Sequence, residues 1–98
     1  MVEATGTRET PGPRRLVWVG VLTPLAGRAT APIRLDRDVV VLGPARVCRA
    51  SDDFVIEDPG GTTFVDGVPV LSCLLHDGDL VQVGPSLFRF ERALEERS

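Results

Sequence analysis

The feature that most constrains this fold is a series of short apolar segments separated by turn residues. From Arg14 onward, valine-rich segments alternate with Gly, Pro and Asp at a spacing of roughly 8–12 residues. Each segment is shorter than an ordinary helix, and no long helical periodicity is present. A chain of 98 residues leaves room for one domain. The sequence therefore predicts a single all-β domain, a sandwich or barrel of short antiparallel strands.

The apolar segments give the expected strands, which are Leu16–Leu22, Thr30–Leu35, Val39–Leu42, Arg46–Ala50, Phe54–Glu57, Thr63–Val65, Val68–Leu71, Leu80–Val83 and Leu87–Phe90. Turns are expected between them, the first at Thr23-Pro24 and Ala26-Gly27, and a tight hairpin is expected at Gly43-Pro44. Because side chains alternate along a strand, Phe54 and Ile56 should share one face, and so should Phe88 and Phe90.

Asp and Gly mark the remaining turns, because both tolerate positive φ and Asp accepts bonds from nearby backbone N–H groups. The predicted structural turn residues are Asp66, Gly67, Asp77, Gly78, Asp79 and Gly84. At the chain ends we expect a disordered leader over residues 1–13 and a tail over residues 92–98, with the sandwich at 14–91. The tail, counted from Glu91, could form one helical turn.

Composition excludes several classes of protein. The net charge is −3 and 43% of the residues are hydrophobic, which argues against nucleic-acid binding and against whole-chain disorder. No apolar segment approaches a membrane span, and no signal peptide is visible. All 11 basic residues are Arg, as in proteins from GC-rich genomes. We therefore expect a bacterial, cytoplasmic domain whose two cysteines are free thiols.

The segments Thr63–Gly67, Leu75–Gly84 and Leu87–Phe90 resemble the C-terminal half of a forkhead-associated (FHA) domain. That family's pattern is Gly-Thr-Phe-Val-Asn-Gly, then Leu-x-Asp-Gly-Asp-x-Ile-x-Ile-Gly, then a final Phe-x-Phe strand. Upstream, Val55–Asp58 resembles its strand-then-Asp segment. The resemblance implies a β-sandwich and a protein-interaction module that binds phosphothreonine peptides.

The chain departs from this family where phosphothreonine would bind. The family uses an Arg after the Gly that ends the third strand, then a Ser and a His, and later an Asn. Here Pro44 follows Gly43, the next strand starts at once, and only Pro-Gly-Gly-Thr separates Asp58 from Thr63. We therefore expect an FHA-like sandwich that lacks one edge strand and the phosphothreonine loops.

Loss of that strand exposes a new sheet edge made of Asp38, Val39, Val40, Val41 and Leu42. Bare apolar edges bind further strands unless they are blocked. One interpretation is a docking edge for another protein or a second copy. The other is an edge protected by Arg37, Asp38 and Pro44 as gatekeepers. We expect a non-catalytic interaction or scaffolding module, with any activity supplied by a linked effector domain or an operon neighbour.

Two alternatives remain open. The chain could bind a phosphorylated or acidic peptide through Arg28, Arg46 and Arg49, although Arg46 and Arg49 should point to opposite faces of one strand.

The second alternative is a small metal protein or enzyme built on Cys48, Cys73 and His76, with Asp77 or Asp79 nearby. A fourth Cys or His ligand is absent from the sequence. Cys48 is expected in the core, as is Trp18, while His76 is expected at the surface. We therefore expect neither a metal ion nor a cofactor.

Overall fold

The computed structural model describes residues 14–97, which form strands, turns and bends without a helix and so offer no helix that could cross a membrane. The strands are β2 (Arg15–Ala26), β3 (Ile33–Leu35), β4 (Val39–Leu42), β5 (Ala45–Ala50), β6 (Asp53–Glu57), β7 (Thr63–Val65), β8 (Val68–Val70), β9 (Ser72–Leu74), β10 (Leu80–Val83) and β11 (Ser86–Arg97). The leader predicted over residues 1–13 lies outside the described residues.

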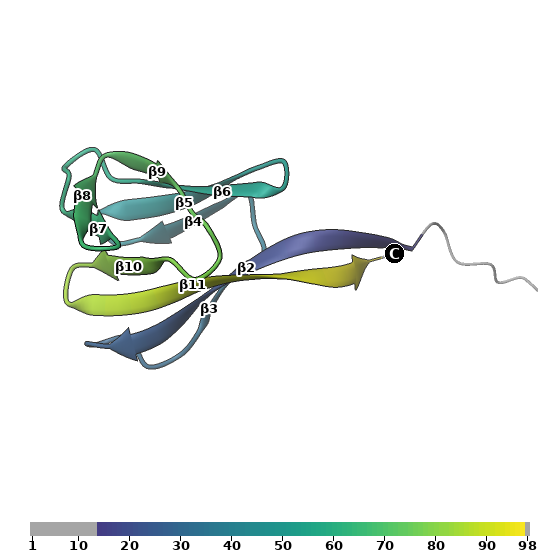
Figure 1. The fold of residues 1–98 in the computed structure, drawn as a ribbon, viewed down its shortest axis with the longest axis horizontal. Coiled ribbons are helices and arrows are strands. Elements are labelled where there is room, and N and C mark those ends of the chain that lie inside the picture. The colour runs from purple at the N-terminus through teal and green to yellow at the C-terminus, as the bar shows by residue number, and fades with distance from the viewer. Residues whose placement is uncertain (1–13, 98) are drawn as a thin grey trace, which may run out of the picture.

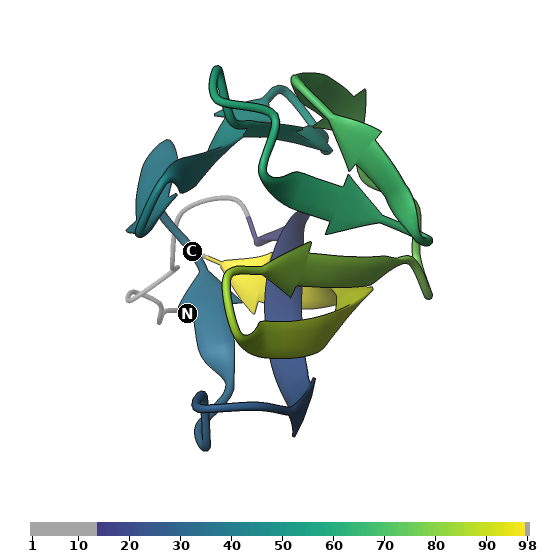
Figure 2. The same ribbon diagram turned by 90° about the vertical axis from the view of Figure 1, so that its left-hand side faces the viewer.

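Within the described residues the strands make two antiparallel sheets. The six-stranded sheet has the order β3-β2-β11-β10-β7-β8, and the four-stranded sheet has the order β4-β5-β6-β9. The two sheets face each other across the core, as Figures 1 and 2 show. This arrangement confirms the prediction of a small all-β sandwich.

The core forms where the inward faces of the two sheets meet. The rings of Phe54 and Phe90 lie 5.5 Å apart between centroids and are both buried. Ile56 shares the inward face of β6 with Phe54, and Phe88 shares that of β11 with Phe90. Both shared faces were predicted from the alternation of the sequence. The other buried apolar core residues are Leu22, Leu35, Ala45, Val47, Val65, Leu75, Val81 and Val83.

The predicted Asp-Gly hairpin is present between β7 and β8. Asp66 and Gly67 have φ values of 52° and 81°, so both central turn positions are left-handed, as a two-residue hairpin with the strand twist requires. The Asp66 carboxylate also accepts a bond from the N–H of Leu80 at 2.8 Å. The predicted turn glycines Gly78 and Gly84 have positive φ as well.

The two carboxylates around Gly78 bind backbone groups in different directions. Asp79 accepts a bond from the N–H of His76 at 2.7 Å and thereby closes its own turn. Asp77 accepts a bond from the N–H of Arg92 at 2.7 Å and thereby ties the turn to β11. These residues are the structural turn that the sequence predicts.

A third carboxylate, Asp58, organises the loop between β6 and β7. Only 2% of Asp58 is exposed, and it accepts bonds from the N–H groups of Gly60 and Thr62 and from the hydroxyls of Thr62 and Thr63, at 2.8–3.0 Å. The hydroxyl bonds, from Thr62 first and then Thr63, hold the pKa of Asp58 below its ordinary value.

The turn expected at Thr23-Pro24 is wrong, because β2 continues to Ala26. The N–H of Phe90 donates to the carbonyl of Asp79, away from β2, so the even-numbered residues of β2 that lie opposite Phe90 and Phe88 direct their backbone groups away from β11. On that side β3 pairs with Gly20–Leu22. Pro24 therefore lies past the end of β3, where no ladder bond is lost through its missing N–H. The chain turns at Gly27, whose φ is 95°.

The helical turn expected after Glu91 is also wrong. β11 continues as a strand to Arg97 and pairs with β2 as far as the Arg97–Arg15 pair. The valines of β2 give this segment a strand partner, and pairing replaces a helix too short to stand alone. Figure 1 shows the resulting two-stranded ribbon projecting from the sandwich.

Side chains on both faces hold the ribbon to the sandwich. On one face the guanidinium of Arg92 lies 4.3 Å from the centroid of the Trp18 ring and donates to the carbonyl of Asp52. On the other face Arg34 of β3 binds the carboxylate of Glu95. Trp18 is thus partly buried under Arg92 at the border of the core, rather than enclosed in it.

Candidate functional site

The strand predicted as a bare edge, β4, lies at the end of the four-stranded sheet. Among residues 14–97 it pairs only with β5. Val39 and Val41 are on the outer face, with exposed fractions of 47% and 70%, while Val40 and Leu42 face the sandwich interior. We call the side of Val39–Leu42 that is turned away from β5 the β4 edge.

Hydrogen bonding determines which backbone groups the β4 edge presents. Leu42 and Ala45 flank a two-residue turn, and the N–H of Arg49 donates to the carbonyl of Asp38 at 2.8 Å. In an antiparallel pair the bonded positions alternate, so Val40 and Leu42 also bond to β5. It follows that Val39 and Val41 direct their N–H and C=O groups outward along the β4 edge.

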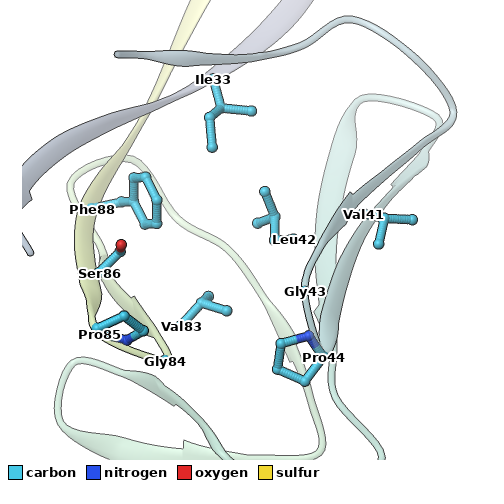
Figure 3. Close-up of a pocket in the computed structure, with 10 residues that line it drawn as sticks. All are labelled: Ile33, Val41, Leu42, Gly43, Pro44, Val83, Gly84, Pro85, Ser86 and Phe88. Atoms are coloured by element: carbon cyan, nitrogen blue, oxygen red, sulfur yellow. The ribbon is translucent and has the colours of Figure 1, made fainter. Parts of the chain in front are cut away.

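An apolar hollow of about 390 Å³ opens beside this edge, between the β4–β5 turn and the β10–β11 turn. In Figure 3, Leu42, Ile33 and Phe88 point into it, and Val41 points away from it. Its remaining lining residues are Gly43, Pro44, Val83, Gly84, Pro85 and Ser86. The hollow therefore lies where a strand added to β4 would direct its inward side chains.

A second hollow, of about 460 Å³, lies along the same strand toward Arg37 and is more polar. Arg34, Asp36 and Arg37 line it together with the three valines of β4. Arg34 lies 3.4 Å from Asp36 and also binds Glu95, and the bond to Glu95 raises the pKa of Arg34. The β4 edge thus has an apolar end at Leu42 and a charged end at Arg37.

The other edges of the described sheets differ from β4. In β8 the central residue is Pro69, whose missing N–H falls on the outward side of the strand. In β9 the outward N–H groups belong to Ser72 and Leu74, and β3 has three residues with Arg34 at its centre. Within residues 14–97, β4 is the edge strand made wholly of Val and Leu.

Two of the three arginines predicted as an anion site, Arg46 and Arg49, do not converge. Arg46 is on the outer face of β5 and donates to Glu57 at 2.9 Å. Arg49 is on the opposite face, 5.2 Å from the centroid of the Phe54 ring, and donates to the carbonyl of Ser51. Arg28 is exposed in the bend after β2. The predicted opposition of Arg46 and Arg49 is therefore present in the structure.

The prediction that Cys48 lies in the core is wrong. It is on the outer face of β5 beside Arg46, and its sulfur lies 3.6 Å from a carboxylate oxygen of Glu57. Burial, followed by the charge of Glu57, raises the pKa of the Cys48 thiol. A raised thiol pKa is the opposite of what a nucleophile needs.

Cys73 is on β9, and burial, followed by the nearby carboxylates of Asp79 and Asp66, raises the pKa of its thiol. His76 is exposed, as predicted, and its Nδ1 lies 3.7 Å from Asp79. Over residues 14–97, no three Cys, His, Asp or Glu side chains gather in a group that could hold a metal ion.

Sequence reasoning identified the edge but missed the hollow beside it. Ile33, Phe88 and Val83 come from three different strands and meet only after both sheets form. The one available signal was the pair of Gly-Pro dipeptides, Gly43-Pro44 and Gly84-Pro85, which form the two turns at its mouth.

No protein-family model matches the chain, and a search of curated proteins finds no match.

Proposed function

We propose that this protein is a non-catalytic interaction module, FHA-like in its sequence pattern, that binds an extended segment of a protein through the β4 edge. One observation carries the proposal. Val39 and Val41 direct backbone donors and acceptors outward, directly beside an apolar hollow, and within residues 14–97 no strand pairs with them. Strand addition uses this combination, because backbone bonds give affinity and side-chain pockets give specificity.

The geometry defines what such a segment must look like. Its side chains alternate between the two faces of the enlarged sheet. Those on the inner face would enter the hollow formed by Leu42, Ile33 and Phe88 and should be apolar. Those on the outer face would lie beside Val39 and Val41, where β-branched side chains pack well.

The placement of the arginines supports backbone recognition rather than phosphate recognition. A phosphate needs several converging donors, and Arg46 is already paired with Glu57 while Arg49 is on the opposite face of β5. The composition supports a bacterial cytoplasmic setting. In that setting the module brings proteins together, and the catalytic activity belongs to a partner or a linked domain.

The test is selection of a phage-displayed library of short peptides on three forms of the protein. Val41→Pro removes an outward donor from the β4 edge. Leu74→Pro is the matched control, because Leu74 also has an outward N–H and lies at the opposite edge of the same sheet. We expect the selection to enrich peptides with alternating apolar residues. These peptides should bind the native protein and Leu74→Pro, and they should bind Val41→Pro at least tenfold more weakly. Equal binding by both variants, or no enrichment, would contradict the proposal.

A further inference from the structure

We propose that the segment bound by the β4 edge is the β4 edge of a second copy of this chain, paired antiparallel about a two-fold axis at Val41. This inference rests on the proposed function, because it names the partner of the same edge. A two-fold dimer requires an edge that complements itself. Three properties of β4 meet that requirement.

The first property is backbone complementarity. Val41 directs both its N–H and its C=O outward, so two copies centred on this residue can each donate to and accept from the other. The same register places Val39 of each copy opposite Gly43 of the other. The edge of one copy therefore offers the donors and acceptors that the other copy needs.

The second property concerns the inward face. With the axis at Val41, Val40 of each copy lies opposite Leu42 of the other, so the inward-facing side chains that meet across the axis are apolar. A register centred on Val40 would instead place the carboxylate of Asp38 opposite Leu42. Desolvation of an unpaired carboxylate is costly, so the register centred on Val41 is favoured.

The third property concerns the outer face. On the outer face, Glu57, Arg46 and Val41 are cross-strand neighbours in one row. In the dimer this row continues across the axis into Val41, Arg46 and Glu57 of the second copy. Arg46 is paired with Glu57 at 2.9 Å in its own chain. The two Arg46 positions are separated by three strand spacings, about 14 Å, which exceeds the screening length at 0.1 M salt. Exposed valines thus meet at the axis, flanked by charges that are already paired.

Cysteine cross-linking tests this register in a chain that carries Cys48→Ser and Cys73→Ser. Directly opposite residues of a bonded antiparallel pair have Cα atoms about 5.5 Å apart, within disulfide range. We expect Val41→Cys to form a covalent dimer on mild oxidation. Val39→Cys is the matched control, because its two copies would lie about 13 Å apart along the strands. Equal cross-linking at both positions, or none at position 41, would overturn the inference.

Sedimentation of the otherwise native chain gives a second readout. Only four residues of β4 would pair, so the interface is small and we expect a weak dimer, whose fraction rises as the protein concentration approaches about 1 mM. Val41→Lys keeps the backbone donor but places two like charges at the axis, and it should sediment as a monomer while its circular dichroism is unchanged.

A native chain that stays monomeric overturns this inference. If it also binds peptides through the β4 edge, the proposed function stands without self-pairing. If it binds none, both fail.

Discussion

Replacing Gly27 by Ala should destabilise this protein far more than replacing Gly78 by Ala, although the two glycines have nearly the same backbone conformation. Their φ values are 95° and 91°. A Cβ on Gly27 would lie 1.9 Å from the carbonyl oxygen of Pro85 and 2.8 Å from the Cα of Ser86, whereas a Cβ on Gly78 would meet no atom of the described residues within 4 Å. Comparing the two Ala variants therefore separates the energetic cost of backbone strain from the cost of close packing.

The expected magnitudes follow from these contacts. A side chain at positive φ costs about 1–2 kcal/mol, offset in part by about 0.4–1 kcal/mol from the loss of unfolded-state freedom. Gly27→Ala must in addition push the β10–β11 turn away, which costs about 1–3 kcal/mol for overpacking. That movement also breaks the bond from the N–H of Ala29 to the Ser86 hydroxyl, 3.1 Å long, for about 1 kcal/mol. The excess loss for Gly27→Ala over Gly78→Ala is therefore about 2–4 kcal/mol.

Urea unfolding followed by circular dichroism measures both variants against the native chain. If the two variants lose the same free energy of unfolding within about 0.5 kcal/mol, the contact between Gly27 and the Pro85 turn does not constrain the fold. The outcome also bears on function, since Pro85 and Ser86 form one wall of the hollow beside the β4 edge.

Three further predictions concern the acid dependence of stability, the affinity for phosphothreonine peptides and the state of the two thiols. Because the pKa of Asp58 is lowered in the folded state, its contribution to stability is present above the unfolded value of 3.8 and is lost as the pH falls through the folded value. Asp58→Asn should remove that part of the acid dependence seen in urea unfolding at graded pH. Phosphothreonine peptides should bind no tighter than about 10 μM in fluorescence polarisation, and phosphate-dependent binding below that would restore the phosphopeptide alternative. Thiol counting under denaturing, non-reducing conditions should find Cys48 and Cys73 both unpaired, and stoichiometric zinc in elemental analysis would support the metal alternative.

Local chemistry made part of this fold predictable from the sequence. The Gly43-Pro44 hairpin depends on one left-handed residue and one fixed φ, both visible in the sequence, and β4 is found at the bounds predicted for it. The expectation that Cys48 lies in the core follows from the ordinary burial of cysteine. The two-residue period instead places Cys48 on the same side as Arg46, and the register of β5 agrees with that period.

Non-local pairing accounts for what the sequence did not predict. Nothing within Glu91–Arg97 identifies a strand, because its mixed charges suit a helix equally well, and it becomes a strand by pairing with the far end of β2. Pro24 suggests a turn in the sequence because nothing local reveals that the pairing of β2 with β3 stops at Leu22, before Pro24. The hollow was missed for the same reason, since it exists only between the two sheets.

Whether the β4 edge is used for pairing or protected from it can be judged by comparison with the β8 edge of the same molecule. At β8, Pro69 occupies the central outward position and removes the donor that a further strand would need. At β4 the corresponding outward positions are Val39 and Val41, which keep their donors and expose apolar side chains. The gatekeepers Arg37, Asp38 and Pro44 all lie outside the strand, so they limit the length of a pairing rather than prevent it. Proline blocks the β8 edge, whereas the β4 edge keeps its outward donors beside exposed valines, and this difference supports the proposal that the β4 edge pairs with a further strand.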